Sequence, residues 1–156
     1  MILRRTLVAL LLAIAPLAAC AGGGAGEARP AASARETVDA FLQAAADSNL
    51  TRMSQLWGTV RGPARTTGQP TDYEKRIFVM QTYLRGSTHR VVADNPGATE
   101  AQRLVHVQIR RADCVYMVPF TAVRSNSGTW VVNSFDLDIL GTPGRPCEGN
   151  QSQPSQ

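Results

Sequence analysis

Two aspartates and two tyrosines near apolar segments of this sequence are candidates for proton transfer. Asp136 and Asp138 lie near the end of one apolar run, and Tyr83 and Tyr116 lie in two other apolar segments. An aspartate base near a tyrosine donor could catalyse proton transfer in a closed pocket. The aspartates alternate with apolar residues such as Phe135, which predicts that they face solvent, and buried tyrosines are more often core residues. We therefore assign no catalytic residue and leave an enzymatic role open.

The sequence pattern gives little support for metal or cofactor chemistry. His89 and His106 lie in different segments, and neither has a second ligand at the spacing of a zinc site. The chain has no glycine-rich phosphate loop, nucleophile elbow or paired-cysteine motif. It carries 16 basic and 12 acidic residues, and the basic excess falls when Arg4 and Arg5 leave with the leader described below. We expect no metal, no cofactor and no nucleic-acid partner.

Residues 1–20 have the build of a secretory leader. Arg4 and Arg5 form a basic start, an apolar run follows, and Leu17-Ala18-Ala19-Cys20 closes the segment. The apolar run is too short to span a bilayer as a helix. The final LAAC resembles the lipobox of bacterial lipoproteins, which implies cleavage before Cys20 and a diacylglyceryl group on its sulfur. The alternative is a soluble-secretion signal with a chance cysteine.

This resemblance implies a domain organisation. Residues 1–19 are the signal peptide, Cys20 is the lipidation site, and 20–33 form a flexible linker without a large apolar side chain. A single α+β domain spans 34–147, and a disordered tail spans 148–156. The expected location is the cell envelope, with the protein held on a bacterial membrane through its N-terminal lipid. Two or three acyl chains anchor a protein stably, whereas one chain anchors it only marginally.

Four β-rich segments in the second half of the chain predict one antiparallel sheet. They span 88–93, 104–111, 114–123 and 130–139, with turn-forming residues between them. The weakness of the first segment leaves the sheet at three or four strands. Pro119 cannot donate a backbone hydrogen bond, so it predicts a bulge or a sheet edge within the third segment.

Three helices are predicted before the sheet. The first begins after Ser33, has its apolar face at positions 38, 41, 42 and 45, and shows capping-box spacing between Ser33 and Glu36. A short second helix covers 50–57, and 58–70 is predicted to be a long loop. A third helix, capped by Asp72 or Thr71 and ended by Arg85-Gly86, should pack Ile77, Met80 and Leu84 on the concave face of the sheet.

Two cysteines remain once Cys20 carries lipid, and we predict that Cys114 and Cys147 form a disulfide. Export places the domain in a compartment where disulfides persist. A hairpin turn near Ser127 brings Cys114 close to residue 139, and the eight residues from there to Cys147 can fold back over the neighbouring strand. The alternative is two separate thiols, with Cys114 buried as a small apolar residue.

The order of helices followed by a bent antiparallel sheet resembles the nuclear-transport-factor-2-like superfamily. The likeness lies in ETVDAFLQAAADSNLTRMSQLW near the start and WVVNSFDL in the closing strand, and it covers about 34–140. It implies an α+β fold in which N-terminal helices pack on a curved, cone-like antiparallel sheet of three to four strands. The open end of such a cone commonly forms a pocket. Candidate lining residues are Trp57, Tyr83, Tyr116 and Phe135, each of which also suits an ordinary core position.

Three functions remain open at this point. The favoured one is a non-catalytic module that binds a small apolar ligand or another envelope protein. The superfamily also contains ketosteroid isomerase-like and polyketide cyclase-like enzymes, and a buried carboxylate near Tyr83 or Tyr116 would favour such an enzyme. A structural domain that forms homodimers is the other alternative. A filled cone and an exposed apolar patch on the sheet would favour it.

Overall fold

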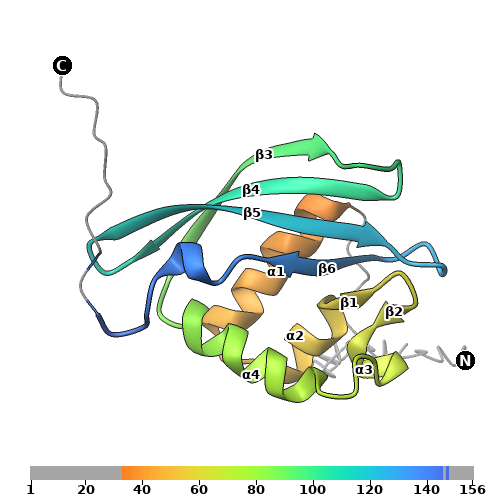
Figure 1. Cartoon of the computed structure of the whole chain (residues 1–156), viewed down its shortest axis with the longest axis horizontal. Coiled ribbons are helices and arrows are strands. Elements are labelled where there is room, and N and C mark those ends of the chain that lie inside the picture. Colours follow the sequence, from red (N-terminus) through yellow and green to blue (C-terminus); the bar gives the residue numbers. More distant parts are fainter. Residues whose placement is uncertain (1–32, 146, 148–156) are drawn as a thin grey trace, which may run out of the picture.

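The computed structural model describes residues 33–145 and residue 147. It has the expected α+β architecture, in which helices precede a four-stranded antiparallel sheet (Figure 1). The elements in chain order are α1 (Ala34–Ala46), α2 (Leu50–Leu56), β1 (Gly58–Thr59), β2 (Gly62–Pro63), α3 (Ala64–Thr67), α4 (Tyr73–Leu84), β3 (Thr88–Pro96), β4 (Gln102–Arg111), β5 (Cys114–Arg124), β6 (Trp130–Phe135) and the 3-10 helix η1 (Asp138–Leu140). The predicted signal peptide, Cys20, the linker up to residue 32 and the tail lie outside the described residues. No helix within 33–145 is long and apolar enough to cross a membrane.

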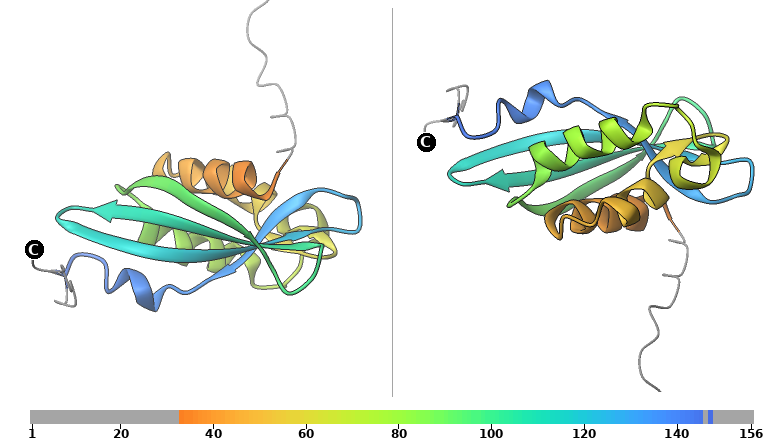
Figure 2. Two further views of the ribbon diagram at one scale, coloured as in Figure 1. Left: turned by 90° about the horizontal axis from the view of Figure 1, so that it is seen from above. Right: turned by 90° about the horizontal axis from the view of Figure 1, so that it is seen from below.

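The first helix begins where the sequence predicted. Ser33 Oγ accepts a hydrogen bond from the backbone N–H of Glu36 at 3.2 Å, which satisfies one of the free donors of the first turn. The predicted apolar face is buried, including Val38, Phe41 and Leu42. α1 lies across one face of the sheet and contacts all four of its strands (Figure 2). It is therefore the element that covers the sheet and closes the core.

The sheet has the strand order β3-β4-β5-β6 with antiparallel neighbours throughout. Alternate residues of the two central strands point into the core, as the period-two pattern predicts. The fully buried ones are Val105, Val107, Ile109, Val118, Phe120 and Ala122. Residues 112 and 113 connect β4 to β5 in the tight turn that was predicted, with Ala112 at a φ of 49°.

The last strand is shorter than predicted. β6 ends at Phe135, and the expected extension to Ile139 is wrong, because Asp138–Leu140 form the 3-10 helix instead. Asp136 Oδ1 accepts a hydrogen bond from the backbone N–H of Asp138 at 2.9 Å, a local turn that competes with the strand. The β5–β6 ladder also ends at the Phe120–Phe135 pair, and Phe120 is the residue directly after Pro119. At Pro119, β5 therefore has no partner strand on the β6 side and forms a local edge of the sheet. Such an edge accommodates a proline, which has no backbone N–H to donate.

Residues 58–70 are more ordered than the predicted loop. β1 and β2 form a two-stranded ribbon in which Gly58 pairs with Pro63 and Thr59 with Gly62, and α3 follows directly. A Cβ atom at Gly58 would lie 2.2 Å from the carbonyl oxygen of Gly62, so only glycine permits this approach. The ribbon is tied to the main sheet by the Asn133 side chain, whose Nδ2 donates to the Gly58 carbonyl at 3.0 Å.

α4 occupies a different position from the predicted one. Ile77, Met80 and Leu84 are buried as expected, but the closest neighbours of the helix are α1 and α2, and the sheet face is covered chiefly by α1. Figure 2 shows α1 and α4 on the same side of the sheet. α4 consequently runs beside β6 without packing closely along it. The space that remains between the two elements is the site described below.

The C-terminal end of α4 is closed by Arg111 and by a disulfide. Arg111 donates from Nη1 to the Tyr83 carbonyl at 2.9 Å and from Nη2 to the Leu140 carbonyl, and its guanidinium lies 5.5 Å from the centre of the Tyr116 ring. The structure pairs Cys114 with Cys147 in a disulfide with a Cα–Cα distance of 5.7 Å. We call this region the closed end.

Candidate functional site

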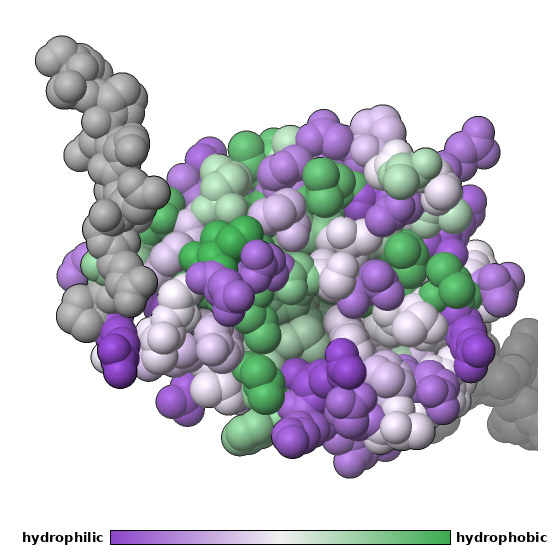
Figure 3. Space-filling model, viewed as in Figure 1, coloured by the Kyte–Doolittle hydropathy of each residue, from purple (hydrophilic) through white to green (hydrophobic). Residues whose placement is uncertain are grey.

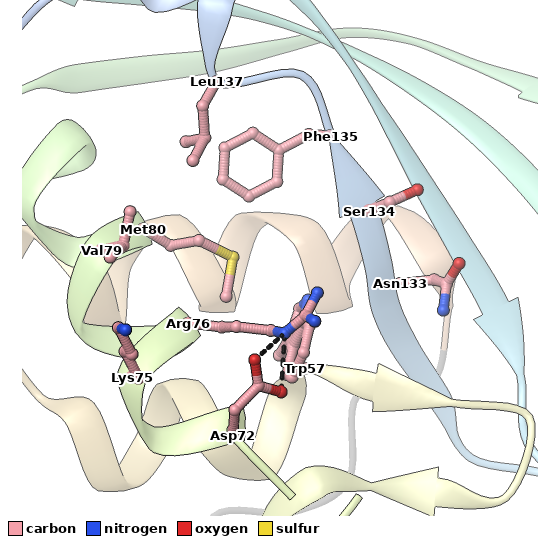
Figure 4. Close-up of a pocket in the computed structure, with 10 residues that line it drawn as sticks. All are labelled: Trp57, Asp72, Lys75, Arg76, Val79, Met80, Asn133, Ser134, Phe135 and Leu137. Carbon is pink, nitrogen blue, oxygen red and sulfur yellow. Dashed lines mark hydrogen bonds and ion pairs between the residues drawn. The ribbon is translucent and has the colours of Figure 1, made fainter. Parts of the chain in front are cut away.

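A pocket of about 360 Å³ opens between α4 and β6, near the N-terminal end of α4. Figure 3 shows a hollow on this face of the molecule, with apolar side chains inside it and hydrophilic ones along its lower edge. Its volume falls in the range of small-molecule sites. The lining residues are Trp57, Asp72, Lys75, Arg76, Val79, Met80, Asn133, Ser134, Phe135 and Leu137 (Figure 4). We call this region the open end.

Aromatic and aliphatic side chains from three elements form the floor of the pocket. Trp57 ends α2, Met80 comes from α4, and Phe135 is the last residue of β6. The Phe135 ring stacks on Phe120 with centroids 4.4 Å apart and meets Phe41 edge-on at 6.2 Å. Phe41 and Phe120 thus hold the Phe135 ring on its core side. Figure 4 shows Met80 facing this ring across the pocket. The floor is therefore a preformed apolar surface.

The rim of the pocket on α4 is positively charged. Lys75 and Arg76 are consecutive, exposed residues on the first turns of α4, and Asp72 is the helix N-cap residue. Arg76 Nε donates to both carboxylate oxygens of Asp72, at 2.9 and 3.0 Å. The hydrogen bond from Arg76 is the main reason that the pKa of Asp72 lies below its ordinary value. Two cations thus share one anion, and the rim keeps a positive excess.

Hydrogen-bond donors at this rim outnumber the acceptors that they reach. Among the described residues, the terminal nitrogens of Arg76 and the ammonium of Lys75 have no acceptor. The indole Nε1 of Trp57 also lacks one within 33–145, although Trp57 is only 6% exposed. No fully buried polar side-chain atom in the described part of the chain is unpaired, so the unpaired Nε1 keeps some contact with solvent. This is consistent with the position of Trp57, which lines both this pocket and a second cavity. Three kinds of N–H donor are therefore available to a ligand.

A β-bulge in β6 extends the site toward the β1–β2 ribbon. The ladder pairs Thr121 with Ser134 and then Ala122 with Val132, which leaves Asn133 without a partner in the pairing. The Asn133 side chain turns to the ribbon, and a second cavity of about 410 Å³ lies there. It shares Trp57, Arg76 and Asn133 with the first pocket and adds Arg61, Gln69 and Pro70. The two cavities form one cleft with an apolar part and a polar, cationic part.

Two of the four predicted lining residues belong to the pocket. Trp57 and Phe135 line it, whereas Tyr83 and Tyr116 do not. Both tyrosines are half-buried against the core, and they meet Arg111 at the closed end through the Tyr83 carbonyl and the Tyr116 ring. They were expected as possible pocket lining, but Tyr83 lies in the last turn of α4 and Tyr116 in β5, away from the residues that line the pocket.

The charged part of the site was missed from the sequence. Asp72 and Arg76 stand four residues apart, which is the spacing of an ion pair on one helix face. That signal was present, but such pairs are usually solvated and carry no information about a cavity. The deciding fact is the open space beside β6, which depends on how α4 docks on α1 and α2.

The carboxylates of the molecule do not provide a good general base at this site. Asp136 and Asp138 are exposed, as the alternation predicted. The pocket carboxylate, Asp72, is exposed and has a lowered pKa, whereas a general base works best with a pKa near the operating pH. Its two oxygens are already occupied by Arg76. The geometry suits recognition of a ligand better than proton transfer.

The histidines serve local contacts. His89 Nε2 lies 3.0 Å from Asp39 Oδ1, which joins β3 to α1, and His106 Nδ1 lies 3.3 Å from Asn95 Nδ2 on the outer side of the sheet. Within residues 33–145 and 147, no group of three or more histidine, cysteine, aspartate or glutamate side chains is arranged to hold a metal ion. The donor-rich rim is therefore the feature that marks the site.

Comparison with known proteins gives no independent indication of function. No protein-family model, curated protein or solved structure matches this chain.

Proposed function

We propose that this protein is a lipid-anchored bacterial envelope lipoprotein whose α+β domain binds a small, mainly apolar ligand without transforming it. The observation that carries the proposal is the preformed floor of Trp57, Met80 and Phe135 in an open pocket of about 360 Å³. Burial of an apolar ligand against such a floor is favourable by roughly 25 cal/mol for each Å² removed from water. The resemblance of the sequence to the nuclear-transport-factor-2-like superfamily supports the proposal, because the open end of that cone commonly forms a pocket.

The anchoring part of the proposal rests on the LAAC sequence that ends at Cys20. Twelve residues separate Cys20 from Ser33, and the thirteen Cα–Cα steps span at most about 45 Å when fully extended. The domain would then sample the space just above the membrane surface. Mass spectrometry of the protein extracted from membranes tests this part, with an acylated N-terminal Cys20 as the expected result and an unmodified chain cut elsewhere as the contrary one.

The two alternatives have weaker support. A cyclase- or isomerase-like enzyme would need a buried base, and the carboxylate at the pocket is exposed and ion-paired. A dimerising module would need a continuous apolar patch on the outer sheet face. Met117 is exposed there, but it stands in a row with Gln108 and Arg90, which are joined by a hydrogen bond of 3.2 Å. A homodimer formed through this face is thus a lesser candidate.

Binding of an uncharged apolar dye tests the ligand-binding proposal. N-phenyl-1-naphthylamine gains fluorescence when it leaves water, and full-length protein carrying Cys20→Ser provides a background without acyl chains. Val79→Trp should fill the pocket and weaken dye binding about tenfold, since Val79 lines the pocket and is 37% exposed. Phe78→Trp, at the neighbouring and more exposed position outside the pocket, is the matched control and should bind as the parent does. Equal binding by all three proteins would refute the proposed site.

A further inference from the structure

The cleft combines an apolar floor with a rim that offers donors to a ligand. The floor is built from Trp57, Met80 and Phe135, and the rim donors are Lys75, the terminal nitrogens of Arg76 and the indole N–H of Trp57. A wholly apolar ligand would leave these donors to water. A ligand that carries its own acceptors next to its apolar body would satisfy both parts.

We propose that the ligand of this pocket is a single-chain amphiphile with an anionic head, held by Arg76 and Lys75 with its chain on Met80 and Phe135. This inference rests on the proposed function, because it specifies the ligand of the same pocket. The shared chemistry is an acyl or alkyl chain that ends in a carboxylate or a phosphate. A planar carboxylate and a tetrahedral phosphate both present pairs of neighbouring acceptor oxygens, which the guanidinium edge matches in a bidentate way.

The geometry of Arg76 explains why its partner Asp72 does not already fill the site. Both Asp72 oxygens receive their hydrogen bonds from Nε, so the carboxylate takes one edge of the guanidinium and leaves Nη1 and Nη2 without an acceptor in the described part of the chain. Figure 4 shows the Asp72 carboxylate on one side of the Arg76 guanidinium, and both Arg76 and Trp57 line the pocket. Asp72 thereby holds the arginine in place while its second edge stays available.

The balance of charge favours an anion over a neutral head. Lys75 and Arg76 contribute two positive charges to the rim, and Asp72 contributes the single negative one. The adjoining cavity adds the exposed Arg61 and shares Arg76, so a larger head group with further charge has room on the cationic side. A second cation within reach strengthens binding of a carboxylate or phosphate because the site is partly shielded from water.

Matched probes separate this inference from the proposed function. Decanoate, decyl phosphate and decanol share one alkyl chain and differ in the head, and each is used below its critical micelle concentration to displace N-phenyl-1-naphthylamine from the Cys20→Ser protein. We expect at least one of the two anionic probes to bind about tenfold or more tightly than decanol, and the preferred one identifies the head group. Equal binding of all three would overturn the anionic head and leave the pocket function intact. Binding of none would refute the pocket function itself.

Charge variants test which residues hold the head. Arg76→Gln should weaken binding of the preferred anionic probe about tenfold or more and leave decanol within about twofold, because a charge-assisted hydrogen bond is lost. Arg85→Gln removes the same charge from an exposed position at the other end of α4 and should leave both probes unchanged. Equal weakening by Arg76→Gln and Arg85→Gln would overturn the direct contact.

The ion pair needs a control of its own, because Arg76→Gln also leaves Asp72 as an uncompensated anion at the rim. The double variant Asp72→Asn/Arg76→Gln removes both charges and so leaves the net charge unchanged. If Arg76 contacts the head directly, this variant still binds the anionic probe about tenfold more weakly than the parent. Full recovery of affinity in the double variant would show that only the field of the rim acts, and it would overturn the assignment of Arg76 as the head-group ligand.

Discussion

An arginine lies at each end of α4, Arg76 from the helix itself and Arg111 from β4, and the two are used differently. At the closed end Arg111 donates to the backbone carbonyls of Tyr83 and Leu140 and lies over the Tyr116 ring. At the open end Arg76 is bound on one edge by Asp72, and its other edge meets no acceptor among the described residues. A guanidinium whose donors are satisfied by backbone holds elements together, whereas one with free donors beside an apolar floor is available to a ligand.

The packing around the helix follows the same division. Leu84, Ile109 and Leu140 are at most 1% exposed, and the disulfide between Cys114 and Cys147 lies beyond them. At the open end Val79 is 37% exposed and faces the cavity. We therefore expect substitutions at the closed end to change the free energy of unfolding, and those at the open end to change binding.

The largest effect is expected from Leu84→Ala. Truncation of this buried side chain should lower the free energy of unfolding by about 2–5 kcal/mol, because it removes apolar contacts and leaves a cavity. Val79→Ala, one helical turn nearer the open end, should change it by less than about 0.5 kcal/mol, as for a surface substitution. Urea denaturation followed by circular dichroism measures both, and equal losses would erase the distinction between the two ends.

The disulfide should contribute the next largest amount. It closes a loop with a sequence separation of 33, for which the chain-entropy model gives about 3–4 kcal/mol. The double variant Cys114→Ser/Cys147→Ser should lose that stability and keep its affinity for ligand, since both cysteines lie away from the pocket. Thiol counting on the denatured, unreduced Cys20→Ser protein provides the direct check. Two free thiols would contradict the bridge.

A smaller loss should follow when Arg111 is removed. Arg111→Met keeps an unbranched, mainly apolar stem but removes the guanidinium and leaves the carbonyls of Tyr83 and Leu140 without their charged donor, which should cost about 1.5–3 kcal/mol. The adjacent Arg110 is exposed, and Arg110→Met is expected to stay within about 0.5 kcal/mol of the parent. Equal losses of unfolding free energy from the two substitutions would show that the contacts of Arg111 do not stabilise the closed end.

The sequence predicts the closed end better than the open end, for physical reasons. α1, β4 and β5 carry apolar periodicity that burial enforces, and the Arg111–Cys114 turn follows from the two residues between the strands. The β1–β2 ribbon has no such period. It depends on the close approach of Gly58 to Gly62 and on a distant side chain, Asn133, so local pattern alone predicted only a loop.

The site shows the same limit. Trp57 and Phe135 were accessible as candidates because large aromatic side chains suit either a core or a pocket wall. Alternation of apolar residues continues beyond Phe135, but the turn made by Asp136 overrides it and ends β6. Lys75 and Arg76 have the pattern of a solvated helix face. Their proximity to a cavity results from the docking of α4 on α1 and α2, which is a tertiary property.

The smallest expected change in the free energy of unfolding comes from the Asp72–Arg76 ion pair, and the titration of Asp72 tests this pair directly. The hydrogen bond from Arg76 lowers the pKa of Asp72, so the ion pair stabilises the folded protein above the pKa of the unfolded chain. That contribution is lost as the pH falls through the lowered pKa of the folded state. The Asp72 side chain is 51% exposed, so solvent screening keeps the effect on unfolding small.

Arg76→Gln should therefore raise the pKa of Asp72 toward its ordinary value and change the free energy of unfolding little. Lys75→Gln should raise it less, because Lys75 acts on Asp72 only through its charge. Carbon-detected NMR of the Asp72 carboxyl group across the acidic range measures both shifts. A pKa of Asp72 that stays the same without Arg76 would mean that the two side chains are not held together in solution. Asp72 would then not hold the Arg76 guanidinium in place at the pocket. The open end would lack a fixed arginine, in contrast to Arg111 at the closed end.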